Sequence, residues 1–305
     1  MALLANKIKI ASQPGGRPQA AVELAPEGAL AAALPAVGQP PVYAFAALPP
    51  GALTPGIAEA NIHAAEVVSA AVRSALDQVS PPSRWVTLVL PDTTARVFVL
   101  DFDSLPSKAA EIMPVLRFRL RKMVPFDVEH AALSYQVLFQ EKSGVKVLAT
   151  IMPGPILAEY EAAVRAAGYE PGAVLPSSLA AIAALDSLEP ILAANLSSVA
   201  LTTSITSGQD LLLYRTIDLP SDPVLRLAEV QRSIAVAAAY FEDKIMARPQ
   251  QLHYAGGENV VDFARAIDDP ELAVVAMAPT PATGATTAMG PMSFAGINGA
   301  LAGVA

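Results

Sequence analysis

Two different spacings of apolar residues alternate along this chain, and together they predict a mixture of strands and helices. Short runs rich in Val, Ile, Leu and Thr, bounded by Gly, Pro or Asp, are typical of strands. Longer segments, in which apolar residues recur every three or four positions, are typical of helices that bury one face. Strands are predicted at residues 7–10, 20–24, 85–90, 96–102, 132–139, 145–151, 191–194, 199–206, 210–217 and 252–255, and helices at 59–79, 107–123, 155–167, 177–185, 223–246 and 260–267.

The order of these segments predicts an α/β protein with more than one domain. Strand hairpins precede helices in both halves of the chain, and 305 residues exceed the usual size of one domain. Residues 98–153 form a strand–helix–strand–strand unit that we interpret as a small module inserted into the first half. The proline-rich stretch 35–57 is predicted to be an extended loop. Residues 272–305 carry no charge and are rich in small residues, so we expect a disordered tail.

Composition and charge exclude several classes of protein. The chain has no cysteine, which excludes disulfide scaffolds, Cys-ligated zinc and thiol catalysis. Its 20 basic and 28 acidic residues give a net charge of −8, which disfavours general binding to nucleic acid. The first 30 residues lack a signal-peptide pattern, and no apolar run is long enough to span a membrane. We therefore expect a cytoplasmic protein.

Few residues have a spacing that indicates catalysis or metal binding. His63, His130 and His253 have no second ligand at metal-binding spacing, and the common protease, esterase and phosphate-loop motifs do not occur. Gly256 and Gly257 lie between a predicted strand and a predicted helix, where a helix N-terminus could bind an anion. The alternative is that these glycines only form a tight turn.

A basic cluster interrupts the acidic chain. Arg117, Arg119, Arg121 and Lys122 lie together on a predicted helix, and apolar residues of the same helix form a separate stripe. This cluster is either a solvated basic face or a docking surface for an acidic partner or an anionic membrane.

Two neighbouring segments resemble the PilM family of type IV pilus assembly proteins. Residues 86–106 read VTLVLPDTTARVFVLDFDSLP, and residues 116–138 read LRFRLRKMVPFDVEHAALSYQVL. The order and spacing of these motifs are similar to the family, and a weaker similarity continues through LLLYRTIDL and LHYAGG in the second half. The resemblance covers about residues 7–268.

The resemblance implies an actin-like fold, with two lobes around a nucleotide cleft and a small subdomain inserted in the first lobe. It assigns residues 1–97 and 154–188 to the first lobe, 98–153 to the insertion and 189–271 to the second lobe. The family links the pilus machinery to the inner membrane, so the implied location is cytoplasmic and peripheral to that membrane, and the membrane is reached only through a partner.

That partner, in the family, is the cytoplasmic N-terminal tail of the membrane protein PilN, which binds between the insertion and the first lobe. The residues implied to shape this groove, some of which could instead be core, are Phe98, Leu116, Arg117, Arg119 and Phe126. Contacts with other pilus assembly proteins are also implied. Self-association, seen among actin-like proteins, is left open.

The nucleotide motifs depart from the family. The first phosphate loop of the family has an acidic residue and a glycine, and the matching position is read here as Ile10-Ala11-Ser12-Gln13. The second is read as Asn195-Leu196-Ser197, again without the acid or the glycine. Only Gly256-Gly257 is retained, so Asn195, Ser197, Gly256 and Gly257 are predicted to line a degenerate cleft. We expect a scaffold that binds ATP and Mg²⁺ weakly or not at all and has no enzymatic activity. The alternatives are an ATPase, active or gated by nucleotide, and a scaffold of type II secretion.

Overall fold

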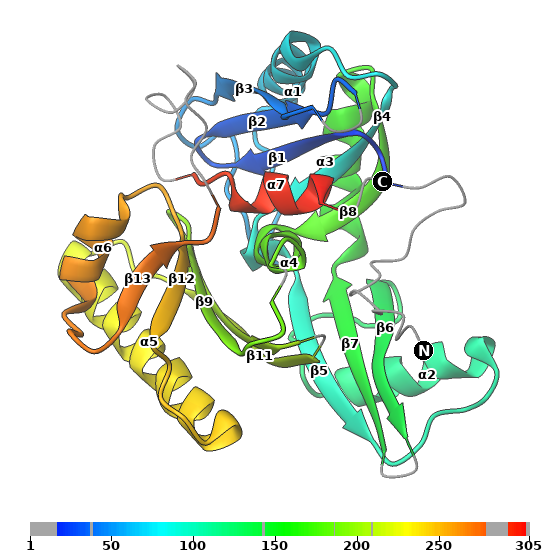
Figure 1. The fold of residues 1–305 in the computed structure, drawn as a ribbon. Helices are drawn as coiled ribbons and strands as arrows, with labels where there is room; N and C mark the ends of the chain where they lie inside the picture. The colour runs from blue at the N-terminus through cyan, green and yellow to red at the C-terminus, as the bar shows by residue number, and fades with distance from the viewer. Residues whose placement is uncertain are drawn as a thin grey trace.

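The chain folds around three β-sheets, each of which has a hydrophobic core of its own (Figure 1). The computed structural model describes residues 17–36, 39–141, 144–185, 187–208, 210–278 and 292–302. The strands are β1 Ala20–Ala25, β2 Gly28–Ala33, β3 Val42–Ala47, β4 Trp85–Leu90, β5 Arg96–Phe102, β6 Ala132–Glu141, β7 Gly144–Met152, β8 Glu170–Pro176, β9 Ile191–Leu196, β10 Ala200–Ser207, β11 Asp210–Asp218, β12 Gln251–Ala255 and β13 Ala273–Ala276. The helices are α1 Ala65–Val79, α2 Ala109–Leu120, α3 Gly154–Ala166, α4 Ser177–Ala183, α5 Pro223–Ile245, α6 Val260–Ile267 and α7 Ala295–Leu301, with a 3₁₀ turn, η1, at Asp92–Thr94. This confirms the predicted α/β class.

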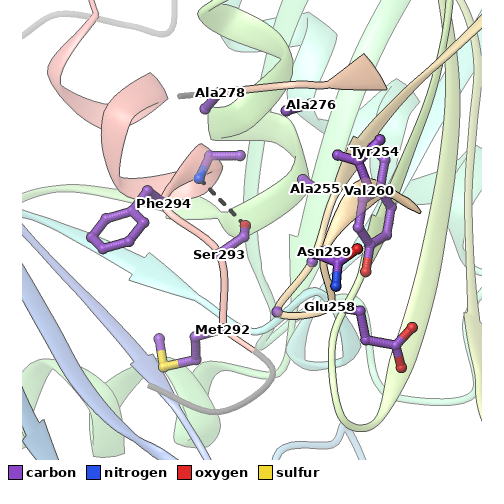
Figure 2. A pocket seen from close by; sticks show the side chains of 13 residues that line it. Tyr254, Ala255, Glu258, Asn259, Val260, Ala276, Ala278, Met292, Ser293 and Phe294 are labelled. Carbon is purple, nitrogen blue, oxygen red and sulfur yellow. Dashed lines mark hydrogen bonds between the residues drawn. The ribbon is translucent and has the colours of Figure 1, made fainter. Parts of the chain in front are cut away.

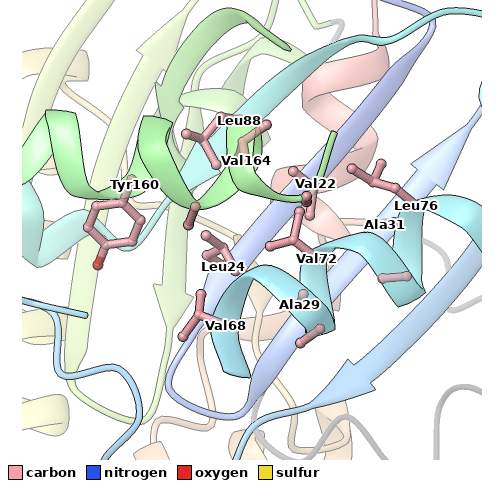
Figure 3. Packing of buried hydrophobic residues seen from close by; sticks show 14 of the residues in the cluster. Val22, Leu24, Ala29, Ala31, Val68, Val72, Leu76, Leu88, Tyr160 and Val164 are labelled. Carbon is pink, nitrogen blue, oxygen red and sulfur yellow. The ribbon is translucent and has the colours of Figure 1, made fainter. Parts of the chain in front are cut away.

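The first sheet has the strand order β3-β2-β1-β4-β8 and is covered on both faces. Because side chains alternate along a strand, Val22 and Leu24 of β1 face one side, where they pack with Val68 and Val72 of α1 and with α3 (Figure 3). Ala21 faces the opposite side, where the covering residues come from α4 and α7. Small alanines in β1 and β2 let the helices approach the sheet closely.

The second sheet has the order β11-β10-β9-β12-β13, and α5 and α6 pack on the same core. The third sheet, β5-β7-β6, is built from the segment predicted as an insertion, and α2 covers one of its faces. Its other face contacts α4 and β11, through Leu148, Leu179 and Leu211 among others. The strand–helix–strand–strand order of the insertion is thus confirmed, whereas the domain boundaries stay a prediction.

The expectation of a disordered tail after residue 271 is wrong for the part of it that the structure describes. Residues 273–276 form β13, which pairs in parallel with β12. Residues 295–301 form α7, in which Ile297 and Ala300 are fully buried against the first sheet. In α7, low charge reflects burial rather than disorder, because an uncharged, small-residue helix fits a narrow space between α4 and β1 (Figure 1).

Besides β13, three strands of the first sheet were not predicted. Residues 42–47 were predicted as part of a loop, but they form β3, whose prolines lie on either side of the strand rather than within it. The prolines and glycine of β8 are tolerated because β8, like β3, is an edge strand. β2 is mostly alanine and has little strand propensity. The strand predicted at residues 7–10 lies outside the described residues.

In the described part of the chain, no helix combines the length and the apolarity that crossing a membrane requires.

Candidate functional site

A polar cluster lies where the first and second sheets approach each other. Glu23 near the end of β1 and Asn195 near the end of β9 meet at the start of α4, the helix that connects the two sheets. Ser177 donates a hydrogen bond to the Glu23 carboxylate at 2.6 Å, and the Asn195 amide donates to Ser178 at 2.8 Å. The cluster therefore links both lobes through the connecting helix.

Asp92 extends this cluster from η1. It accepts hydrogen bonds from the Ser178 hydroxyl at 2.5 Å and the Ser178 backbone N–H at 2.9 Å. Tyr214 of β11 donates to the same carboxylate at 3.1 Å, which adds a second contact between the lobes. Glu23 and Asp92 were missed at the sequence level, although an acidic residue within the apolar strand 20–24 was a usable signal.

The two carboxyl groups are held in an environment that favours their protonated forms. Burial, reinforced by the charge of Asp92, raises the pKa of Glu23 to about 7, even though Ser177 donates a hydrogen bond to it. Burial also raises the pKa of Asp92. The cluster contains no neighbouring cation within the described residues to offset this, so ionising both acids is unfavourable.

The turn between β1 and β2 faces the turn between β9 and β10 across a small cavity of about 40 Å³. This geometry identifies Ala25-Pro26-Glu27-Gly28 as the first-lobe turn that faces the cleft, whereas Ile10–Gln13 lies outside the described residues. Pro26 has no backbone N–H to donate to a phosphate, and Glu27 would repel one. This turn is poorly suited to binding an anion.

In the turn between β9 and β10, two backbone N–H groups already donate hydrogen bonds to a side chain of the same turn. The Ser197 hydroxyl accepts hydrogen bonds from the backbone N–H groups of Val199 and Ala200, at 3.4 Å and 3.0 Å. These are amides that a phosphate-binding turn would offer to its ligand. Arg226 of α5 donates hydrogen bonds to the carbonyls of Ser197 and Ser198, and these bonds hold the turn in place. The guanidinium group of Arg226 is therefore already engaged with the backbone.

Gly256 and Gly257 lie on the wall of a larger cavity, of about 380 Å³. Tyr254 and Asn259 line one side of it, and Ser293 and Phe294, just before α7, line another (Figure 2). A Cβ atom on Gly256 would lie 2.1 Å from the Tyr254 hydroxyl, so this glycine is required by packing. The Tyr254 ring stacks on Phe263 with 3.8 Å between ring centroids. Among the described residues that line this cavity and the smaller one, none is Lys or Arg. The walls carry the acids Glu23, Glu27, Asp92 and Glu258, and without a basic side chain beside Glu27 and Glu258 they are a poor fit for a triphosphate.

The residues implied in partner binding divide between the core and the surface of the insertion. Leu116 of α2 is fully buried, and Phe98 and Phe126 are partly buried against the same core. Arg117 donates to the backbone carbonyls of Val128 and Ala131 and so holds the chain that follows the helix. Of the five, only Arg119 is classed as exposed.

The fold was compared with known proteins. No family model matches the chain, and no curated protein matches it. A solved structure titled as a PilM–PilN type IV pilus biogenesis complex is similar, with a TM-score of 0.72 and 17% sequence identity, over 94% of this chain and 99% of that one. The cytoplasmic domain of EpsL, an inner-membrane component of the type II secretion system of Vibrio cholerae, is similar with a TM-score of 0.52 and 14% identity, over 88% of this chain and 91% of that one. These likenesses show the two-lobed, actin-like fold with its insertion, as predicted.

Proposed function

We propose that this chain is a PilM-like scaffold that binds the cytoplasmic N-terminal tail of a PilN-like membrane protein. The observation that carries the proposal is the fold shared with the PilM–PilN structure over nearly the full length of both chains. The shared length includes the insertion, beside which the tail would bind. The proposed location is therefore cytoplasmic, at the inner membrane.

We also infer that the cleft does not turn over ATP. Pro26 removes an amide donor from one turn, and Ser197 occupies two amides of the other. No Lys or Arg is among the described residues that line the cavities, so these walls supply no counter-charge to a triphosphate. Asn195, Ser197, Gly256 and Gly257 then serve the structure of the cleft rather than a nucleotide.

Calorimetric titration tests both proposals. A synthetic peptide of a PilN N-terminal tail is titrated into the protein, with a scrambled peptide as the control, and Mg-ATP is titrated separately. We expect saturable binding of the tail peptide alone, unchanged when Mg-ATP is present. If the folded protein does not bind the tail peptide, the proposed scaffold function is contradicted. Tight binding of Mg-ATP would overturn the inference about the cleft.

A pair of variants tests the groove. Arg119→Gln removes an exposed cation from the insertion. Arg265→Gln removes a cation from α6, where the Arg265 side chain is 73% exposed. Weaker tail binding is expected only for the first. Equal effects of the two variants would mean that Arg119 does not contribute to the groove.

A scaffold of type II secretion is the second candidate, because the likeness to the EpsL cytoplasmic domain extends over most of both chains. The same titration with the cytoplasmic tail of a type II secretion membrane protein separates the two candidates. Preference for that tail would favour the second.

A further inference from the structure

The end of α2 and the turn after it expose an apolar side chain surrounded by cations. Phe118 is 75% exposed, and Met123 is 42% exposed. Leu116 and Leu120 of the same helix are fully buried, so the helix turns Phe118 away from its core. Arg119 and Lys122 lie within one helical turn of Phe118 on the exposed side. We call Phe118, Arg119, Lys122 and Met123 the α2 tip.

The cations of the tip form no ion pair within the described residues, whereas the neighbouring cations are engaged. Arg117 donates to backbone carbonyls, and Arg121 forms an ion pair with Glu129 at 2.6 Å. Arg119 and Lys122 form no ion pair with any residue that the structure describes. The nearby acids are also occupied, since Glu129 pairs with Arg121 and Asp127 with His130. Residues 112–126 contain no acidic residue at all.

We propose that the α2 tip docks on a lipid bilayer that carries anionic headgroups. Lys and Arg beside such a surface are attracted to it, and an exposed aromatic ring can enter the boundary between headgroups and acyl chains. The rest of the chain opposes adsorption, because its net charge is −8. Binding through the tip would therefore fix one orientation of the molecule on the membrane.

The exposure of Phe118 favours a bilayer over a peptide as the surface that contacts this side chain. A peptide that buried an aromatic side chain of this kind would need a groove beside it, but Phe118 projects from the helix and is three-quarters exposed. The cavities at the cleft are lined by residues of other elements. Figure 1 places α2 on the outer side of the β5-β7-β6 sheet, away from the second lobe, where a flat surface could reach it.

Vesicle co-sedimentation tests this proposal without any protein partner. The full chain is mixed with vesicles of phosphatidylcholine alone or with about 30% phosphatidylglycerol, at low and high salt. We expect binding only to the anionic vesicles, and loss of binding at high salt. Phe118→Ala should weaken it roughly tenfold and Lys122→Gln about fivefold.

A matched pair on α6 controls for charge and apolar exposure. Val261 is 64% exposed and lies one turn from Arg265, as Phe118 lies one turn from Lys122, but Arg265 pairs with Asp262. Val261→Ala and Arg265→Gln should leave vesicle binding unchanged. Equal losses in both pairs would overturn the assignment to the tip.

A spectroscopic readout reports on the tip directly. The chain contains one tryptophan, so Trp85→Phe combined with Phe118→Trp places a single fluorophore at residue 118. A blue shift with anionic vesicles is expected. Absence of binding to anionic vesicles by the folded protein, or a blue shift with polyglutamate and not with vesicles, would overturn the proposal. Because no tail peptide is present, failure here leaves the proposed scaffold function standing.

Discussion

The electrostatics of the cleft depend on one buried acidic side chain, Glu23. It lies in β1 on the face that α7 covers, and it is only 7% exposed. The start of α7 approaches it so closely that a Cβ on Gly296 would lie 2.8 Å from its carboxylate. When an acid enclosed in this way is ionised, the folded state is destabilised, because the charge is removed from water.

This enclosure predicts a pH dependence of stability. The pKa of Glu23 is raised from its ordinary value of 4.5 to about 7, so between these values the folded state holds a proton that the unfolded chain releases. The free energy of unfolding should therefore fall as the pH rises from 4.5 to about 7, by on the order of 3 kcal/mol at most. Urea unfolding across this range measures the slope.

Glu23→Gln should flatten that slope and raise stability at pH 7. Its amide oxygen can accept the hydrogen bond that Ser177 donates to the carboxylate, so this bond survives. Some slope should remain, because burial also raises the pKa of Asp92. The exposed Glu66→Gln is the control and should leave the curve as it is. An unchanged slope in Glu23→Gln would mean that Glu23 is ionised at no cost.

Gly256 gives a second prediction at this scale. Because a Cβ there would meet the Tyr254 ring, Gly256→Ala should lower the free energy of unfolding by about 1–3 kcal/mol. At Gly56 a Cβ would meet nothing within 4 Å, so Gly56→Ala should change it by less than about 0.5 kcal/mol. Chemical denaturation of both variants checks the contrast, and equal stabilities would show that the Gly256 turn can open.

Among the elements, α7 is the one whose role the sequence concealed. Strongly patterned segments such as 85–90, 223–246 and 260–267 were predicted close to their observed bounds. The helix at 295–301 was not, because every turn of it is buried and it therefore lacks the polar face on which periodicity depends. Asn195 and Ser197, predicted from the resemblance, line the small cavity, and their role toward a nucleotide stays a prediction. The position of Pro26 opposite them depends on strand pairing that only the fold supplies.

The packing of α7 predicts a large effect from one truncation. Ile297 is fully buried between α7 and the first sheet, so Ile297→Ala should lower the free energy of unfolding by about 2–5 kcal/mol. Leu225→Ala on α5, where the side chain is 61% exposed, should cost much less. Thermal and urea unfolding give the comparison. Similar small losses in both would indicate that α7 contributes little to the first core.

At the scale of the whole molecule, hydrogen bonds made by Asp92 and Asn195 connect the two lobes. The described residues that line the cavities between them include no Lys or Arg side chain that could bind a nucleotide phosphate. Ligands that bind only the folded state raise the melting temperature. A PilN tail peptide at about 100 times its Kd should therefore stabilise the protein by about 2.7 kcal/mol. Mg-ATP should give no shift, and a scrambled peptide is the control. A shift with Mg-ATP alone would contradict the proposed inert cleft.

The contact between α7 and α4 also bears on the order in which the chain is made. A Cβ on Gly299 would lie 1.8 Å from the Ala180 carbonyl, so the two helices fit together too closely for any other residue. The first sheet contains β1 and β2, at residues 20–33, but gains this part of its core only from residues 294–301. On a ribosome, the first lobe would therefore have to wait, with one face of its sheet uncovered, until the second lobe has been synthesised. Nascent chains stalled before residue 292 should remain sensitive to protease in β1 and β2, whereas chains released after residue 302 should resist it.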